Sequence, residues 1–238
     1  MLIRDDGKSW TAIGQPAHAW LAAQVARHWV PAPPEEVILA VEQHDIAWID
    51  SDRHPPLHAE ASRAAAFFEA PAGLRLEIWR EAALRLVEQS PYAALLVSLH
   101  ATNIHTRYGP PEDAKALLTR QREIQDNLLT RTGAERTAAD READLLFALD
   151  ALSLTLCHDW PARELPAVAG VEHRLTPTGD GTTWTLDPWP LDIDELEIGL
   201  DARRLTERFD DEAVMQSRLD ATPYDRLRFT LRREPEEP

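Results

Sequence analysis

The sequence predicts an α+β fold that is mainly α, with a helical body and a small antiparallel β-sheet formed by the N- and C-terminal segments. Apolar residues recur at helical spacing through most of the stretch from Pro16 to Cys157. Both ends instead alternate apolar and polar residues, as in "MLIRDDGKSWTAIG" and "DRLRFTLRRE". We therefore expect N-terminal strands over residues 1–14, a helical body over 15–165 and a β-rich segment over 166–238.

The expected helices span residues 16–29, 35–49, 59–69, 73–89, 91–106, 111–131 and 137–158. Pro16 suits a first helical turn, and so does "PPEE" at 33–36, where acidic side chains meet the positive end of the helix dipole. The Asp-Gly pair in "DDGK" favours a tight hairpin turn. Each end of the chain has too few strands to be stable alone, so we expect the two ends to pair.

Composition excludes several classes of partner. The chain has 238 residues, 44% of them hydrophobic, which is enough to fill a core. Its formal net charge is −16, and its 25 Lys and Arg form no basic block, so we expect neither nucleic acid nor an anionic membrane as a partner. The single cysteine, the absence of a signal-peptide pattern and the absence of a long apolar run predict a soluble, cytoplasmic protein.

The stretch "AVEQHDIAWID", residues 40–50, places two ionisable groups in an apolar helical pattern. On a helix, His44 shares one stripe with Val41 and Trp48, and Asp45 lies one step round. The pair is therefore expected to face the core. A buried carboxylate without a partner is costly, and a metal ion or a hydrogen-bonded cation removes that cost.

The same pattern recurs on two more expected helices. His18 shares a stripe with Leu21 and Val25, and Asp150 is the only charged residue in "LLFALDALSLTLC". Together with His44 and Asp45, these residues supply two imidazoles and two carboxylates. That set suits a divalent ion such as Mn, Fe, Zn, Co or Mg, with positions left for water or substrate.

The order His … His-Asp … Asp on helices resembles that of the HD superfamily of metal-dependent phosphohydrolases. The segments "IGQPAHAWLA", "AVEQHDIAWID" and "SLHATNIH" look more closely like a bacterial family catalogued as a domain of unknown function, over nearly the whole chain. The resemblance implies an HD-like helical body with His18, His44, Asp45 and Asp150 at its metal positions. HD enzymes often continue with Gly and Lys or Glu after the pair, whereas this chain has "HDIAW".

Further residues are candidates for the same site. His100 continues the apolar stripe of its helix, whereas His105 lies about 140° round an ideal helix, so we expect His100 to lie nearer the ion. Asp45 and His100 are the catalytic candidates. Gln15, His105 and Trp48 are candidates for the substrate-binding rim of a pocket.

Three functions remain open from the sequence. The first is hydrolysis of a small phosphorylated metabolite or nucleotide by a metal-activated water. The second is a non-catalytic HD-like protein that binds a metal or small ligand, which "HDIAW" favours. The third is a structural protein with buried His–Asp hydrogen bonds and no ion. The sequence does not fix the metal, the substrate or the oligomeric state.

Overall fold

The computed structural model describes residues 1–108 and 111–233. Its α-helices are α1 (Gln15–Ala26), α2 (Glu35–Gln43), α3 (Ile49–Arg53), α4 (Ala72–Ala82), α5 (Pro91–Arg107), α6 (Pro111–Thr132), α7 (Arg136–His158) and α8 (Glu212–Ala221). Its strands are β1 (Leu2–Asp5), β2 (Trp10–Ile13), β3 (Leu57–His58), β4 (Arg63–Ala64), β5 (Arg163–Glu164), β6 (Arg174–Pro177), β7 (Thr183–Asp187), β8 (Glu195–Leu205) and β9 (Tyr224–Arg233).

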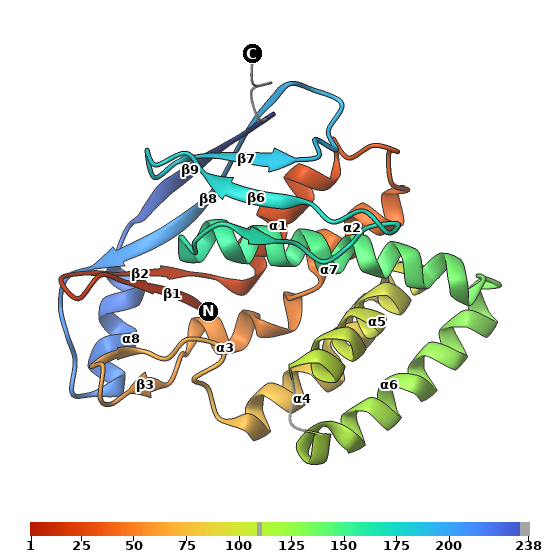
Figure 1. Ribbon diagram of the computed structural model, residues 1–238. Coiled ribbons are helices and arrows are strands. Elements are labelled where there is room, and N and C mark those ends of the chain that lie inside the picture. The colour runs from red at the N-terminus through yellow and green to blue at the C-terminus, as the bar shows by residue number, and fades with distance from the viewer. Residues whose placement is uncertain (109–110, 234–238) are drawn as a thin grey trace.

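The expected small antiparallel sheet is wrong. Seven strands, drawn from both ends and from β5 within the expected helical body, form one mixed sheet in the order β1-β2-β8-β9-β7-β6-β5. The pairing of β7 with β9 is parallel, and the other pairings are antiparallel. The sheet is large and curled, and α1 and α7 pack against it (Figure 1). The fold is thus a helical layer against an extensive mixed sheet.

Chain order could not reveal this topology because the last strand lies in the middle of the sheet. β9 separates β8 from β7, and it pairs with β8 from Tyr224 to Arg232. α8 connects β8 to β9 and was not expected from the sequence. Strand pairing is set by contacts between residues far apart in the chain, whereas alternation reports only that a strand exists.

The helices expected over residues 91–106, 111–131 and 137–158 are confirmed by α5, α6 and α7. The helix expected over 59–69 is wrong, since β3 and β4 form a short hairpin there. The alanine-rich run has high helix propensity, but Ala64 and Ala66 are buried against Met1, Ile3 and Trp10. Tertiary packing overrides the local preference at this position.

The continuous helix expected over 35–49 is also wrong. α2 ends at Gln43, His44 is its C-cap residue, and Asp45 leaves the helical conformation with φ −108° and ψ 16°. A 3₁₀ turn over Ile46–Trp48 and the short helix α3 follow. The His-Asp pair is therefore presented by a helix end rather than by one helical stripe.

The main hydrophobic core joins the helices to the sheet. Apolar residues of α1, α2, α5 and α7 form one buried cluster with residues of β7, β8 and β9. The side-chain amide of Gln24 on α1 donates to the carbonyl of Gly199 on β8 at 3.0 Å and accepts from its N–H at 3.1 Å. In the described parts of the chain, no helix is both long and apolar enough to cross a membrane.

Candidate metal centre

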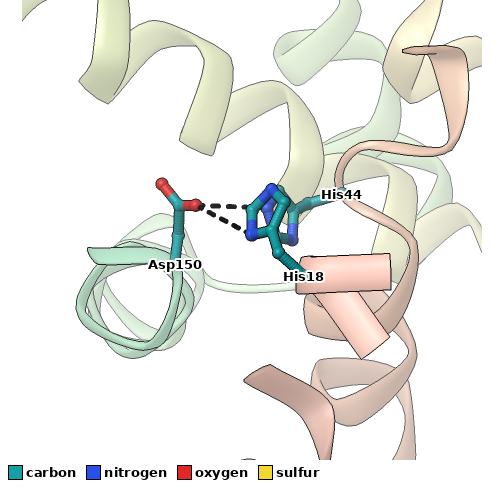
Figure 2. A group of neighbouring side chains, drawn as sticks. All are labelled: His18, His44 and Asp150. Carbon is teal, nitrogen blue, oxygen red and sulfur yellow. Dashed lines mark ion pairs between the residues drawn. The ribbon is translucent and has the colours of Figure 1, made fainter. Parts of the chain in front are cut away.

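His18, His44, Asp45 and Asp150 meet in one buried cluster between α1, the end of α2 and α7. All four are nearly inaccessible to solvent; Asp150 is the most exposed, at 7%. Ligand atoms of His18, His44 and Asp150 lie within 4.8 Å of one another. Figure 2 shows the two imidazoles facing the Asp150 carboxylate. The four ligand candidates, which come from three segments far apart in sequence, are thus brought together.

Hydrogen bonds fix the orientation of the His18 ring. Its Nδ1 lies 3.0 Å from the hydroxyl of Ser153, and that hydroxyl donates to the main-chain carbonyl of Asp150 at 2.9 Å. A hydroxyl has one hydrogen, so Ser153 accepts from the His18 Nδ1–H. His18 Nε2 then faces Asp45 Oδ2 at 2.7 Å. With its proton on Nδ1, the ring carries a lone pair on Nε2. That lone pair and the Asp45 carboxylate can lie this close when a proton or a metal ion is shared between them.

His44 is oriented in the same way. Its Nδ1–H donates to the carbonyl of Val41 at 2.8 Å, which points Nε2 into the cluster. Nε2 lies 3.4 Å from Asp150 Oδ1 and 3.8 Å from Asp45 Oδ2, and it has no hydrogen-bond partner. An imidazole that donates one N–H to a carbonyl and presents the other nitrogen is the usual arrangement of a metal-ligating histidine.

The charges in the cluster are strongly coupled. Burial by itself lowers the pKa of His44, but the charges of Asp45 and Asp150 outweigh it and raise that pKa to about 9. Burial tends to raise the pKa of Asp150, whereas the interaction with the nearby His44 imidazole lowers it to about 2. Without a metal, His44 and Asp150 therefore form a buried imidazolium–carboxylate pair. A divalent ion would replace that proton.

The residues present fit a divalent ion. The 3.4 Å separation of His44 Nε2 and Asp150 Oδ1 is long for a hydrogen bond. It matches the roughly 3.3 Å between two ligands of a tetrahedral ion with bonds of about 2.0–2.1 Å. Asp45 Oδ1 is also buried without a hydrogen-bond partner. The buried cluster could hold a metal ion, with nitrogen and oxygen donors that suit a transition metal.

His100 on α5 lies beside this cluster, and His105 lies farther away. His100 Nε2 is 3.7 Å from Asp150 Oδ2, and its ring centroid is 5.0 Å from that of His44. Both ring nitrogens of His100 are buried without hydrogen-bond partners, and burial lowers its pKa to about 3. His105 instead donates to the carbonyl of Ala101 at 2.8 Å. His100 is thus a neutral polar group next to the cluster.

A cavity of about 440 Å³ opens onto the cluster. Its wall is mainly aromatic and aliphatic, with a few polar groups, as in many small-molecule sites. The lining residues are Gln15, His18, Asp45, Trp48, Phe67, Phe68, Ala72, Arg75, Leu76, Trp79, His100, Ile104, His105, Tyr108, Ala114, Phe147, Asp150, Ala151, Leu154, Trp160 and Arg163.

The rim candidates Gln15, Trp48 and His105 all line this cavity. The Oε1 atom of Gln15 and the Nε1 atom of Trp48 are buried without hydrogen-bond partners. His44 belongs to the cluster but does not line the cavity, whereas His18, Asp45 and Asp150 do.

Sequence reasoning missed Ser153, Arg75 and Arg163. Ser153 follows Asp150 by three residues in the same apolar run, a spacing that puts both on one helix face and could have identified it. Arg75 lies in an ordinary amphipathic helix, and Arg163 lies in a two-residue strand. Neither arginine lies in a local sequence pattern that identifies it as a residue of the site.

The fold and the site define a class of protein in which helices packed on a mixed sheet enclose a buried His/Asp cluster at the base of an aromatic cavity. The chain belongs to the family described as Protein of unknown function (DUF3891), whose model matches residues 1–207. No curated protein and no solved structure gives a significant match to the chain.

Proposed function

We propose that the protein is a metal-dependent phosphohydrolase that acts on a small phosphorylated metabolite or nucleotide through a metal-activated water. The observation that carries the proposal is the meeting of His18, His44, Asp45 and Asp150 in one buried cluster at a cavity. Three of these side chains, His18, His44 and Asp150, could hold a tetrahedral ion and would leave its fourth position free for water. Such an ion would lower the pKa of a water ligand and offset negative charge on a phosphate.

The protein's own residues divide the remaining work. Ser153 and the carbonyl of Val41 hold the rings of His18 and His44 in their ligating orientation. His100, neutral and on the cavity wall, is placed to hydrogen-bond a phosphate oxygen or a water. The apolar wall excludes bulk water, which strengthens these electrostatic interactions.

Local charge supports an anionic substrate despite the formal net charge of −16. The lining includes Arg75 and Arg163, while its two carboxylates, Asp45 and Asp150, both face histidines of the cluster. A divalent ion would add further positive charge. The cavity thus favours a phosphate group within an acidic protein.

The proposal is tested by elemental analysis of the purified protein, followed by a panel of phosphate esters and nucleotides with added Mn, Co or Fe. We expect bound metal and turnover of at least one substrate, with turnover lost in Asp45→Asn and retained in the exposed control Asp144→Asn. Bound metal without turnover would instead support a non-catalytic binding protein. Absence of metal from the wild type and from metal-supplemented samples would overturn both.

A further inference from the structure

We propose that the cavity binds a ligand with a flat apolar body and a second anionic group, which Arg75 holds at a distance from the His/Asp cluster. The identity of the group at the cluster end rests on the proposed function. The anion site at Arg75 involves separate residues. The inferred ligand class is an aromatic or heterocyclic compound that carries a carboxylate or phosphate away from its reacting group.

Arg75 is a cation that lacks a protein partner within the described part of the chain. It lies near the start of α4, is half-buried and lines the cavity. Its Nε is buried and has no hydrogen-bond partner, and the side chain forms no ion pair with a described residue. A guanidinium offers five donors in a planar fork that matches a carboxylate or a phosphate. A buried unsatisfied donor is costly, so an anionic ligand would stabilise this position.

Arg75 and the cluster mark two separate polar ends of the cavity. Arg75 precedes Trp79 by four residues on α4, so both lie on one face of that helix, and both line the cavity together with His105. His105 follows His100 by five residues on α5, a rise of about 7.5 Å. The ring of Trp79 lies between them, 5.8 Å from each imidazole centroid. An anion at Arg75 is therefore not the group at the cluster.

The wall between the two ends suits a flat apolar group. Trp79 and Phe147 are buried, at 8% and 7% exposure, and the Phe147 centroid is 5.8 Å from that of His100. Phe68 and Tyr108, at 52% and 66% exposure, stand at the solvent side of the lining. Aromatic side chains gain both apolar burial and favourable ring geometry from a flat ligand.

The test measures binding to metal-free protein, so that it does not depend on hydrolysis. The probes are 2-naphthoate, 2-naphthol and acetate, which separate the aromatic anion from its neutral body and from a bare anion. By isothermal titration we expect wild type to bind 2-naphthoate at least about 10-fold more tightly than either of the other two. Arg75→Gln should remove the preference for 2-naphthoate over 2-naphthol.

The matched control is Arg80→Gln, which removes an exposed arginine from the same helix and should retain the full preference. Arg75→Lys keeps the positive charge without the planar fork of the guanidinium. It should retain part of the preference for 2-naphthoate. Melting curves establish that each variant is folded. Equal affinity of wild type for 2-naphthoate and 2-naphthol, or an equal loss in both Gln variants, would overturn the inference. A naphthoate preference without any phosphate turnover would overturn only the proposed function.

Discussion

At the scale of single residues, Asp150 decides whether the cluster is a metal site. Asp150→Asn keeps the shape of the side chain and removes the charge that balances an ion. We expect metal affinity to fall by about 10-fold or more. The metal-free variant should lose little stability, because His44 can release its proton when its partner becomes neutral. Metal titration and thermal melting measure the two effects.

Asp144→Asn is the matched control, since Asp144 lies six residues earlier on α7 and is exposed. If Asp150 is only a hydrogen-bonded buried acid, its replacement relieves the cost of burying a charge. The melting temperature would then rise, and unchanged metal affinity would remove Asp150 from the site.

Ser153 provides a second test, because it orients His18 without being a ligand candidate. Ser153→Ala leaves the His18 Nδ1–H without its acceptor, and we expect metal affinity to fall by about 10-fold. The free energy of unfolding should drop by about 1 kcal/mol. Thr155→Val is the control, because Thr155 donates to the carbonyl of Ala151 at 2.6 Å within the same helix. Equal metal affinities in the two variants would exclude a positioning role for Ser153.

At the scale of elements, Gly199 shows how closely β8 and β9 approach. A Cβ at Gly199 would lie 2.6 Å from the carbonyl oxygen of Leu227 and 3.0 Å from Arg226 Nε. Gly199→Ala should therefore destabilise the fold by about 1–3 kcal/mol, measured by urea unfolding. Gly73→Ala on α4 is the control; its Cβ meets nothing within 4 Å. It should stabilise the helix by about 0.5–1 kcal/mol, and equal effects at both glycines would refute the steric argument.

The sequence identified elements and ligand candidates where the information is local. The periodic stretches that became α5, α6 and α7 carry their own pattern, and Asp150 stands out as a charge within an apolar run. Asp45 was selected for the same reason, although the helix assumed for it ends at Gln43. A buried ionisable residue is thus recognisable from its neighbours in sequence, even when the backbone geometry is wrong.

Features that depend on distant contacts were not predictable from one sequence. The hairpin of β3 and β4 replaces an alanine-rich helix because it packs on residues of β1 and β2. The parallel pairing of β7 with β9 joins residues 47 positions apart, such as Thr183 and Thr230, a partner choice that alternation does not encode. Arg75 belongs to the cavity only because α4 and α5 lie against it.

At the scale of the whole molecule, Asp5 links three distant segments. Its carboxylate accepts hydrogen bonds from Arg208 at 2.7 and 2.8 Å and from Arg63 at 3.0 Å. The hydrogen bond from Arg208, with those from the Gly7 N–H and Arg63, holds the pKa of Asp5 well below its usual value against the opposing effect of burial. The stabilisation is therefore present above the unfolded pKa of about 3.9 and is lost as pH falls through the folded pKa.

Asp5→Asn should accordingly lower the free energy of unfolding by about 1 kcal/mol at pH 7, a modest value because the ion pairs are partly exposed and screened. The deficit should be smaller at pH 3. Urea unfolding at both pH values measures it, with Glu60→Gln as a control at an exposed carboxylate that forms no ion pair with a described residue. A deficit of equal size at both pH values would contradict the assignment to the Asp5 charge.

The position of β9 predicts that the region matched by the family model does not fold by itself. That match ends at residue 207, whereas β9 begins at Tyr224 and lies between β8 and β7 in the sheet. Phe229 and Leu231 of β9 are buried in the common core, at 3% and 0% exposure. Burial of two such side chains contributes about 1.5–3 kcal/mol each, comparable with the roughly 5–15 kcal/mol stability of a typical protein.

A chain ending at residue 207 should therefore lose cooperative thermal unfolding, because β8 and β7 both lose the strand between them and the core beneath opens to water. A chain ending at residue 233, which keeps β9, separates this effect from a change in length alone. Circular dichroism melts and hydrogen exchange of β8 amides are the measurements. Cooperative melting of the 207-residue chain at the temperature of the longer chain, with β8 amides still protected, would show that β9 is dispensable and that the sheet is stable without its central strand.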